Sequence, residues 1–438
     1  MPKLMIVAPS AYTLSGLATW LDYLLPGLQE KGWDVTLGLV SGPRYHQPEP
    51  YLLLHPFAKT VNIHCHSVTA FGRVAALRTT IRKINPDIVL SVNIPDALIA
   101  VGVERNLRKS NTRAVMTCHG IQQDLFTDMR KLSKTLDQVI CTNELACRLA
   151  EEIAGIEASR IQHVAYGTEV PGELLATAAN DTFTVAFAGR LEQDQKRIHD
   201  LTEIAANLKS ANVPFRFLIA GSGPEKHDLF RKLESNGLLD QFEFLDFIEP
   251  QFLKERLYSR ADALIVTSTW ETGPIVIWEA MAAGLPVVTS RYIGSGAERL
   301  LWHEDNCLMF DIGDAAEAAR QIRVLATDSN LLNSIRVNAF KTVQQKLSHD
   351  ISVQNWDRVL RAAMELPHLP VHRSKYGLKR SDGRLDRMIG LAGADFIRRV
   401  MRRPPPDSGA GGEWPHTISK NIMSNESFWA LAEKLDER

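Results

Sequence analysis

Two glutamates, Glu271 and Glu279, stand eight residues apart at a predicted strand-to-helix turn. The apolar run 263–266 before them is typical of a buried parallel strand, and a helical pattern follows from Ile275. Positions i and i+8 of a helix lie about 80° apart around its axis, so both carboxylates can face one crevice. This spacing predicts a ligand-binding turn that carries two acidic side chains.

The turn between the glutamates, Thr272-Gly273-Pro274, is expected to start the helix. Thr272 or Gly273 can cap it, and Pro274 suits its first turn because no amide hydrogen is missed there. A helix that starts at the carboxyl end of a parallel strand offers unpaired amides and a positive dipole, which favour an anion such as a diphosphate. We expect the helix to end at Gly284, before another strand at 286–289.

The acidic pair, together with the letters AMAAGLPVV that follow it, resembles the retaining nucleotide-sugar glycosyltransferases of the glycosyltransferase family 4 type, also called group 1. That family commonly has Glu-Gly-Phe-Gly at this turn, whereas this chain has Glu-Thr-Gly-Pro at 271–274. This difference affects the expected identity of the donor sugar more than the expected type of reaction. The resemblance covers residues 1–365 and is strongest from 183 to 314. Without it, the stretch also fits an ordinary strand–helix–strand unit with two surface glutamates.

A second motif, Gly189-Arg190-Leu191 followed by Lys196, comes directly after the apolar run TFTVAFA. The resembling family has a G-R-L…K pattern here that holds the donor diphosphate, although the glycine that commonly follows the lysine is Arg197 in this chain. Departure of the leaving group concentrates negative charge on the diphosphate, which an arginine fork and a lysine point charge can meet. Arginine and lysine near a strand end are also common without such a role.

Two further strand ends carry ligand-binding positions of the resembling family. The run FRFLIA leads into Gly221-Ser222-Gly223-Pro224, which matches the family's G-x-G-P turn. Its glycines would permit close backbone packing near the nucleotide, and a purely structural tight turn explains them equally well. After the predicted strand 242–247, the resemblance implies that Ile248 pairs with the base through its backbone.

The first half of the chain alternates apolar runs with helical patterns, which predicts a doubly wound parallel sheet. Ligands of such sheets lie at the carboxyl ends of the strands, where Gly16 occupies the first strand-to-helix turn and His119 follows the run RAVMTC. In the resembling family a glycine loop lies at the first position, and a histidine at the second reaches the donor sugar. A structural turn glycine and a helix-capping histidine are the plain alternatives. There is no GxGxxG fingerprint, which weighs against a dinucleotide oxidoreductase.

Length and composition fit a globular protein of two or three domains. The chain has 438 residues, of which 45% are hydrophobic and 23% are charged. The resemblance implies the GT-B fold, an α/β architecture of two Rossmann-like doubly wound parallel-sheet domains with the nucleotide-sugar cleft between them. The expected segments are an N-terminal acceptor-side domain (1–167), a linker (168–182), a nucleotide-sugar domain (183–348), a helix that crosses back onto the first domain (349–367) and a basic tail (368–438).

Composition disfavours several classes of function. The net charge of -1 gives no global argument for binding nucleic acid. No apolar run reaches the roughly 18 residues that a membrane-spanning helix needs, and the N-terminus enters a strand without a secretory signal pattern. The five cysteines lack CxxC spacing, which favours reduced thiols. We therefore expect a cytoplasmic protein.

The segment His64-Cys65-His66 could suggest a metal site. Strand alternation sends its two histidines to one face and its cysteine to the other, and no third ligand is evident. We predict no metal ion, and the resemblance implies none, because cationic side chains would neutralise the leaving group.

The basic tail departs from the resembling family. Its segment 368–403 has few acids and carries apolar residues such as Leu385, Ile389, Phe396 and Val400 at helical spacing. This pattern fits a solvated extension or a helix packed on the first domain. It also fits a basic amphipathic segment that contacts a partner or, peripherally, the inner face of a membrane. Its basic residues are Arg373, Lys375, Lys379, Arg380, Arg384, Arg387, Arg398, Arg399, Arg402 and Arg403.

The resemblance implies a mechanism that needs no protein nucleophile and no cofactor besides the donor. Glu279 would hold the ribose hydroxyls and Glu271 the sugar hydroxyls, while Arg190, Lys196 and the turn 272–275 would bind the diphosphate. Catalysis would come from positioning and charge stabilisation, with the departing phosphate assisting the acceptor on the same face of the sugar. The donor would be a nucleotide-diphosphate sugar, with a UDP-sugar as the first expectation. The acceptor would be a glycan, a lipid-linked saccharide or a small molecule in cell-surface polysaccharide or glycoconjugate biosynthesis.

Two other functions stay open from the sequence. One is a nucleotide-sugar epimerase on the same fold, which would form free or epimerised sugar without an acceptor. The other is a catalytically idle protein that binds nucleotide sugars, motivated by the altered turn 272–274. Nucleotide binding without turnover on any acceptor would favour it.

Overall fold

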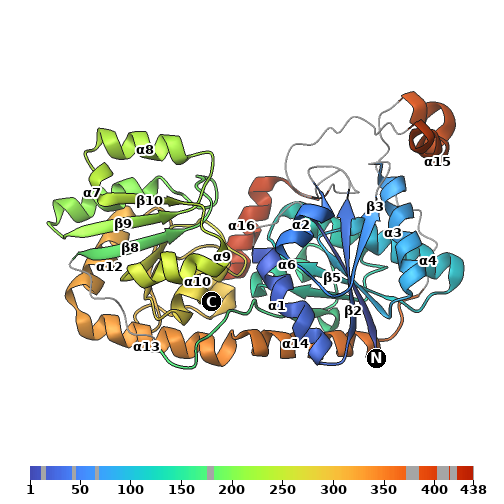
Figure 1. Ribbon diagram of the computed structural model, residues 1–438, viewed down its shortest axis with the longest axis horizontal. Helices are drawn as coiled ribbons and strands as arrows, with labels where there is room; N and C mark the ends of the chain where they lie inside the picture. Colours follow the sequence, from blue (N-terminus) through green and yellow to red (C-terminus); the bar gives the residue numbers. More distant parts are fainter. Residues whose placement is uncertain are drawn as a thin grey trace. The chain divides into compact units, whose positions relative to one another are not determined.

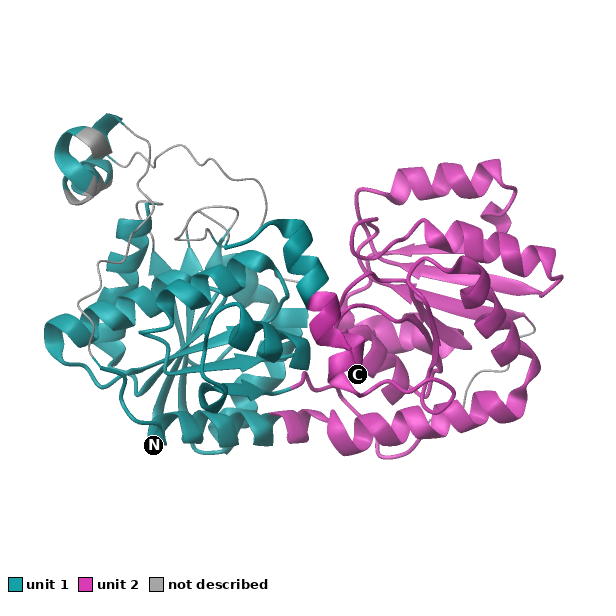
Figure 2. Ribbon diagram, turned by 180° about the vertical axis from the view of Figure 1, so that it is seen from behind, with its two compact units in different colours: residues 1–164, 353–431 teal, residues 165–352, 432–438 magenta. Residues whose placement is uncertain are grey.

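The protein folds into two compact units, and each unit combines segments that are far apart in the sequence. A computed structural model (Figure 1) describes residues 1–10, 16–41, 46–64, 69–174, 182–370, 384–401, 414 and 422–437. Unit 1 comprises residues 1–164 and 353–431, and unit 2 comprises residues 165–352 and 432–438 (Figure 2). The chain therefore passes from one unit to the other three times.

Unit 1 is built on a parallel sheet whose described strands follow the order β3-β2-β1-β4-β5-β6-β7. This order, in which the direction of winding reverses beside β1, is that of doubly wound nucleotide-binding folds. The strands are β1 (Lys3–Ala8), β2 (Asp34–Ser41), β3 (Thr60–His64), β4 (Ile88–Val92), β5 (Arg113–Cys118), β6 (Gln138–Cys141) and β7 (Ile161–His163). The connecting helices are α1 (Gly16–Glu30), α2 (Pro48–Leu54), α3 (Ala70–Ile84), α4 (Pro95–Arg108), α5 (Gln123–Leu132), α6 (Glu144–Glu152) and a 3-10 turn (Ala158–Arg160).

Unit 2 is built on a second parallel sheet, with its described strands in the order β10-β9-β8-β11-β12-β13. The strands are β8 (Phe183–Ala188), β9 (Phe215–Ala220), β10 (Phe242–Asp246), β11 (Ala263–Val266), β12 (Val287–Ser290) and β13 (Leu308–Phe310). The helices are α7 (Asp200–Ser210), α8 (Lys226–Ser235), α9 (Pro250–Arg256), α10 (Ile275–Ala282), α11 (Ser295–Glu298), α12 (Ala315–Thr327) and α13 (Ser329–Lys346), with 3-10 turns at Leu239–Gln241 and Tyr258–Arg260.

The central strands of unit 2, such as β8, β11 and β12, are buried on both faces, which explains why they appear in the sequence as continuous apolar runs. Successive residues of β8 illustrate this pattern. Val185 and Phe187 pack into one hydrophobic cluster, whereas Ala186 and Ala188 pack into the other. Two buried faces require helices on both sides of the sheet. The predicted architecture of two doubly wound parallel sheets is therefore confirmed.

Helix α14 (His349–Glu365) starts in unit 2 and belongs to unit 1 from Val353 onward. Trp356 is fully buried there, and its ring lies 5.2 Å from the ring of Trp20 in α1. A Cβ atom on Gly27 of α1 would lie 2.6 Å from the side chain of Val353, so α1 and α14 approach where a larger residue would clash. Unit 1 is thus completed by a helix that follows unit 2 in the sequence.

The C-terminal extension adds the helices α15 (Arg384–Met401) and α16 (Asn425–Asp436) and one buried tryptophan. Trp414 is 3% exposed, donates its indole N–H to Asp96 at 2.7 Å, and packs its ring 5.0 Å from that of His46. Phe428 of α16 is buried beside Phe126 of α5. Packed aromatic side chains therefore tie Trp414 and the first part of α16 to unit 1, whereas residues 432–438 belong to unit 2. None of the helices in the described ranges is both long and apolar enough to span a membrane.

Candidate functional site

Glu271 lies in the loop between β11 and α10, and its side chain is only 7% exposed. Its Oε1 atom accepts hydrogen bonds from Lys196 Nζ at 2.5 Å and from Ser268 Oγ at 2.6 Å. Its Oε2 atom accepts one from Gln195 Nε2 at 3.3 Å. Because a carboxylate offers about four lone-pair directions, this group can still accept a hydrogen bond from a ligand.

Hydrogen bonds to backbone carbonyls hold the loop of Glu271 against the loop of Lys196. Strands β8 and β11, which lead into these loops, are neighbours in the sheet. Thr267 donates its hydroxyl to the carbonyl of Lys196 at 2.6 Å, and the amide of Thr269 donates to the carbonyl of Gln195 at 2.7 Å. The strand order thus brings together two charged residues that are 75 positions apart in the sequence.

Arg190 is exposed at the same strand end. Its side chain is 65% exposed, and its guanidinium lies 4.0 Å from Glu192, at the limit of an ion pair. Glu192 also accepts hydrogen bonds from the amides of Gln195 and Lys196, at 3.3 and 3.2 Å. Arg190 can therefore reach an anionic ligand without first breaking a buried contact.

The Gly-Ser-Gly-Pro turn after β9 packs against the loop that carries Arg190. A Cβ atom on Gly221 would lie 1.8 Å from the carbonyl oxygen of Gly189, and one on Gly223 would lie 2.2 Å from that of Leu191. Backbone hydrogen bonds of 3.0 and 2.9 Å join the two turns. No side chain fits between them, so both glycines are needed for the packing itself.

Ile248 follows β10 and is buried, with 4% of its surface exposed. The amide of Gly221 donates a hydrogen bond to the carbonyl of Asp246 at 2.7 Å, which places the ends of β9 and β10 side by side. The backbone of Ile248, two residues beyond this bond, belongs to the same edge of the sheet as the glycine turn.

The start of α10 differs from the prediction. The helix begins at Ile275, Pro274 is its N-cap residue with φ −69° and ψ 95°, and no side chain of the described residues caps it. Gly273 has φ 90°, in the left-handed region that favours glycine. The predicted cap by Thr272 or Gly273, with Pro274 inside the first turn, is therefore wrong, because the extended backbone at Pro274 delays the helix.

Glu279 lies in the second turn of α10, is partly buried, and accepts a hydrogen bond from the Tyr258 hydroxyl at 2.9 Å. Burial raises the pKa of Glu279 to about 7, and the Tyr258 hydrogen bond opposes the shift by lowering this pKa. The carboxyl group is therefore close to half ionised at neutral pH, unlike a surface glutamate. The two predicted glutamates thus lie on one strand–helix unit but in different electrostatic surroundings.

Two of the predicted residues, Gly16 and His119, lie in unit 1, whereas the others lie in unit 2. Gly16 is the first residue of α1, and His119 directly follows β5. The rings of His119 and Trp20 lie 4.7 Å apart, edge to face, so His119 lies beside the start of α1. Burial lowers the pKa of His119 to about 3. Its imidazole is therefore neutral at neutral pH and can exchange hydrogen bonds with a hydroxyl group.

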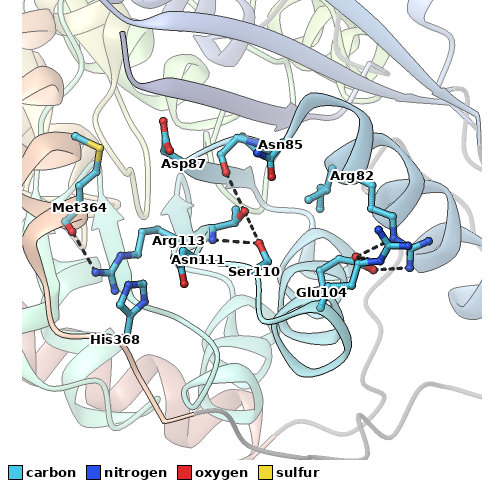
Figure 3. A pocket seen from close by; sticks show the side chains of 13 residues that line it. Arg82, Asn85, Asp87, Glu104, Ser110, Asn111, Arg113, Met364 and His368 are labelled. Atoms are coloured by element: carbon cyan, nitrogen blue, oxygen red, sulfur yellow. Dashed lines mark hydrogen bonds and ion pairs between the residues drawn. The ribbon is translucent and has the colours of Figure 1, made fainter.

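A polar cavity of about 520 Å³ in unit 1 lies at the other end of the sheet (Figure 3). Asp87 and Arg113, at the amino ends of β4 and β5, contribute to its lining, whereas His119 follows the carboxyl end of β5. Charged side chains that line the cavity pair with one another. For example, Glu104 accepts two hydrogen bonds from Arg82, each at 2.8 Å. We therefore do not include this cavity in the candidate site.

No group of His, Cys, Asp and Glu side chains within the described ranges could hold a metal ion. His64 lies 3.1 Å from the hydroxyl of Ser41, while Cys65 and His66 lie outside the described residues. The absence of a metal at this segment stays a prediction.

Three residues that bond the candidate glutamates were not predicted from the sequence: Gln195, Tyr258 and Ser268. Gln195 and Ser268 bond the carboxylate of Glu271, and both are polar residues within three positions of a predicted site residue. A search of the neighbouring polar positions could have found them. Tyr258 is 21 positions from Glu279, and no motif in the sequence connects the two residues.

Comparisons with known proteins identify the family of this chain. The profile of the family described as glycosyl transferases group 1 matches residues 176–342, and that of Glycosyltransferase Family 4 matches residues 14–170. An uncharacterized glycosyltransferase of Methanocaldococcus jannaschii is 29% identical over 187 residues, which cover 43% of this chain and 47% of that protein. The lipopolysaccharide core biosynthesis glycosyltransferase LpsD of Rhizobium meliloti is 29% identical over 130 residues, 30% of this chain and 36% of LpsD. The match therefore spans less than half the length of these curated relatives.

The fold is matched over a longer stretch than the sequence. The crystal structure of Anabaena HepE in complex with UDP and glucose superposes with a TM-score of 0.67, covers 83% of this chain and 100% of HepE, and is 20% identical in sequence. At this identity the likeness establishes the fold alone. Because the two family profiles together cover most of the chain, the protein belongs to the glycosyl transferases of group 1, the glycosyltransferase family 4 type with the GT-B fold.

Proposed function

We propose that this chain transfers a sugar from a nucleotide-diphosphate sugar to a hydroxyl group of an acceptor, with retention of configuration at the sugar carbon. The observation that carries this proposal is the partly buried ion pair between Lys196 and Glu271 at the carboxyl edge of a parallel sheet, beside the exposed Arg190. Two cations at a strand end suit a diphosphate whose charge grows during the reaction. A buried carboxylate next to them suits the hydroxyl groups of a sugar.

The donor would lie along the strand ends of unit 2. Arg190 and Lys196 would hold the diphosphate, and the backbone amides of the turn 272–275 would add partial positive charge. Glu271 would accept a hydrogen bond from the sugar, and Glu279 would accept hydrogen bonds from the ribose.

The base would contact the backbone of Ile248. Gly189 and Gly221 would keep their two turns close enough for the donor to cross them, since even a methyl group on Gly221 would clash there. The glycine turn therefore serves the site through packing, and no direct bond to the nucleotide is assigned to it.

Breaking the bond between the sugar carbon and the phosphate oxygen leaves an additional negative charge on the diphosphate. Arg190 and Lys196 would bind this charge more strongly in the transition state than in the bound donor, which is what accelerates a reaction. The departing oxygen would take the proton of the acceptor hydroxyl while the new bond forms on the same face of the sugar. His119, as a neutral imidazole, would hydrogen-bond a substrate hydroxyl.

Thermal unfolding in the presence of UDP, GDP, ADP and their sugars tests the proposal. A ligand present at about 100 times its Kd raises the free energy of unfolding by about 2.7 kcal/mol, enough to shift Tm measurably. We expect one nucleotide series to stabilise the protein, with UDP tried first because HepE was solved with UDP. If no nucleotide changes Tm or binds by calorimetry, the proposal is wrong.

The same donor, once identified, separates transfer from the two alternatives. An epimerase would convert the donor sugar without an acceptor, and thin-layer chromatography would detect the product. A binding protein would bind nucleotide and release none when acceptors are added. Glycosyl transfer predicts release of nucleotide diphosphate that depends on an acceptor hydroxyl.

For the acceptor we propose a glycan or lipid-linked saccharide, in line with the role of LpsD in lipopolysaccharide core biosynthesis. Helix α15 contacts α3 of unit 1 and exposes large apolar side chains on one face. Ala394 and Arg398, four residues apart, are buried, whereas Phe396 and Val400, also four residues apart, are each 68% exposed. Exposed apolar groups on an arginine-rich helix favour an anionic membrane surface, so we propose that α15 makes a peripheral membrane contact.

The double variant Phe396→Ser and Val400→Ser should reduce co-sedimentation with anionic vesicles at least about tenfold, because each buried apolar side chain contributes about 1.5 kcal/mol or more. Leu53→Ser, at an 85% exposed position on α2, is the matched control and should bind as the wild type does. High salt should weaken wild-type binding. Wild type that stays in the supernatant at low salt, or equal binding by the double variant, would show that α15 is not the membrane contact.

Substitutions are preferable here to removing the tail. A chain cut after Pro367 would also lose the buried contacts of Trp414 and Phe428. Several basic residues of the predicted segment, at 373–380 and 402–403, lie outside the described residues, so their part in membrane binding stays a prediction.

The raised pKa of Glu279 predicts two pH effects of opposite sign. Nucleotide affinity should rise between pH 6 and 8, because the ionised carboxylate accepts ribose hydrogen bonds better than the protonated acid does. The folded state holds this proton up to about pH 7, above the ordinary pKa of 4.5, so ionisation of Glu279 should lower stability as pH rises between these values. The loss should be about 2 kcal/mol, less than the full shift implies because the side chain keeps some contact with water.

Calorimetry with the nucleotide diphosphate and denaturant unfolding, each between pH 5 and 8, check both effects. Glu279→Gln is the reference, since it should remove the stability trend and leave only the pH dependence of the nucleotide phosphate itself. Identical pH profiles for the wild type and Glu279→Gln would contradict the prediction.

A further inference from the structure

The last turn of α16 lies against residues 293–297, which comprise the end of the loop before the short helix α11 and the first turn of that helix, and which are called here the loop 293–297. Asp436, the last residue of α16, belongs to unit 2, as does this loop. Its Oδ2 atom accepts hydrogen bonds from the amides of Gly294 at 2.9 Å and Gly296 at 3.2 Å, and its Oδ1 atom accepts one from Ala297 at 2.8 Å. Hydrogen bonds to a carboxylate are stronger than those between neutral groups, so Asp436 holds the loop firmly.

The loop is shaped to accept this carboxylate. Gly294 has φ 110°, in the left-handed region that favours glycine. A Cβ atom on Gly296 would lie 2.0 Å from the backbone oxygen of Asp436, so a larger residue would push the end of α16 away. Two glycines within three positions therefore fit the loop to Asp436.

The same loop is bonded to the segment that carries Glu271. The amide of Glu271 donates to the carbonyl of Ile293 at 3.1 Å, and the amide of Ile293 donates to the carbonyl of Thr269 at 2.9 Å. Ile293 directly precedes Gly294, whose amide is bonded to Asp436. A short path of hydrogen bonds therefore links Asp436 to the backbone of Thr269 and Glu271, directly before the turn 272–274.

We propose that Asp436 is a positioning residue for the donor site, which fixes the loop 293–297 and through it the backbone of Glu271. The inference rests on the proposed function, because it assumes that Glu271 binds the sugar of the donor. Glu279 is bonded to Tyr258, and the path from Asp436 does not pass through either of them. Loss of Asp436 should therefore impair sugar transfer and spare the binding of the bare nucleotide.

The variants Asp436→Ala and Gly296→Ala test this in the full-length chain. UDP serves as the bare nucleotide and UDP-glucose as the donor. If the wild type prefers another base, the nucleotide diphosphate and the nucleotide sugar of that base are used instead. Each should lower kcat/KM about tenfold, while the Kd of the bare nucleotide changes less than about twofold, because a misplaced sugar ligand impairs the reacting geometry. The double variant should be no worse than either single variant, since both remove one contact. Glu433→Ala, an exposed acid on the same helix, is the matched control and should behave as the wild type does.

Hydrogen exchange at the amides of the loop 293–297 gives a readout that does not depend on activity. Faster exchange in Asp436→Ala, with reduced transfer and unchanged nucleotide binding, would support the proposal. Faster exchange with wild-type kcat/KM, equal losses in nucleotide binding and transfer, or multiplying effects in the double variant would each overturn it. Asp436→Asn keeps a neutral acceptor and should lie between the wild type and Asp436→Ala, which covers the case of an unstable alanine variant.

Failure of this inference and failure of the proposed function give different results. A wild type that binds no nucleotide would overturn both, whereas a wild type that transfers sugar normally and variants that do so equally well would overturn only the role of Asp436.

Discussion

Replacing Lys196 or Arg190 by alanine is expected to slow sugar transfer about a hundredfold, because each change removes a charge-assisted contact worth about 3 kcal/mol in the transition state. The two variants should differ in stability. Lys196 forms a partly buried ion pair with Glu271, whereas Arg190 is 65% exposed. Without Lys196, the carboxylate of Glu271 keeps its hydrogen bonds from Ser268 and Gln195 but loses its charged partner, so Lys196→Ala should lower the free energy of unfolding by about 1–3 kcal/mol. Arg190→Ala should leave it unchanged.

Steady-state transfer or donor hydrolysis, measured together with denaturant unfolding, checks both expectations. Arg320→Ala is a suitable control, because Arg320 forms an exposed ion pair with Glu317 on α12 of the same unit. An exposed pair contributes little to stability, so this variant should match the wild type in both assays. Wild-type turnover in the variants at both 190 and 196 would remove these residues from the diphosphate site.

Glu271→Gln and Glu279→Gln are expected to separate sugar transfer from nucleotide binding. Glu271→Gln should reduce transfer about a hundredfold and spare binding of the bare nucleotide, because we propose that this carboxylate accepts a hydrogen bond from the sugar. Glu279→Gln should instead weaken binding of the nucleotide diphosphate, since the amide replaces one of the two acceptor oxygens with a donor. Glu271→Gln should also lower the free energy of unfolding, because it removes the anion of a partly buried ion pair.

Calorimetry with the nucleotide diphosphate, followed by transfer assays on both variants, decides the roles of the two glutamates. Tyr258→Phe adds an internal reference, because it removes the hydrogen bond to Glu279 without touching Glu271. It should resemble a mild form of Glu279→Gln in nucleotide binding. Equal losses of nucleotide affinity in the variants at 271 and 279 would show that the roles are not divided in this way.

Much of the fold could be predicted because its central strands are buried on both faces. A strand such as β4, predicted and observed at Ile88–Val92, has no polar side to interrupt its apolar run. The positions of Gly189, Arg190 and Glu271 at strand ends follow from the same runs, since each run ends where the chain leaves the sheet. Strand ends were therefore easier to locate than the side-chain contacts that form between them.

Those contacts depend on strand order and side-chain direction, which single positions do not reveal. The sequence assigned Lys196 and Glu271 to different parts of the donor, whereas in the folded chain they bond each other at 2.5 Å. The raised pKa of Glu279 comes from burial in a helix whose neighbours are distant in sequence. The start of α10 was misplaced for a local reason, the extended backbone of Pro274, which propensity rules do not determine.

The three passages of the chain between its units limit how this protein can be recombined. Unit 2 consists of residues 165–352 and 432–438, so a chimera that exchanges it for another donor unit needs joins near 164, 352 and 431. A single crossover near 164 would leave a first unit without Trp356 and Phe428, two of its largest buried side chains. Unit 2 therefore cannot be exchanged as one continuous segment, and if the proposed donor site is correct, substitutions within the turns at 189–196 and 271–275 are the more promising way to change the donor.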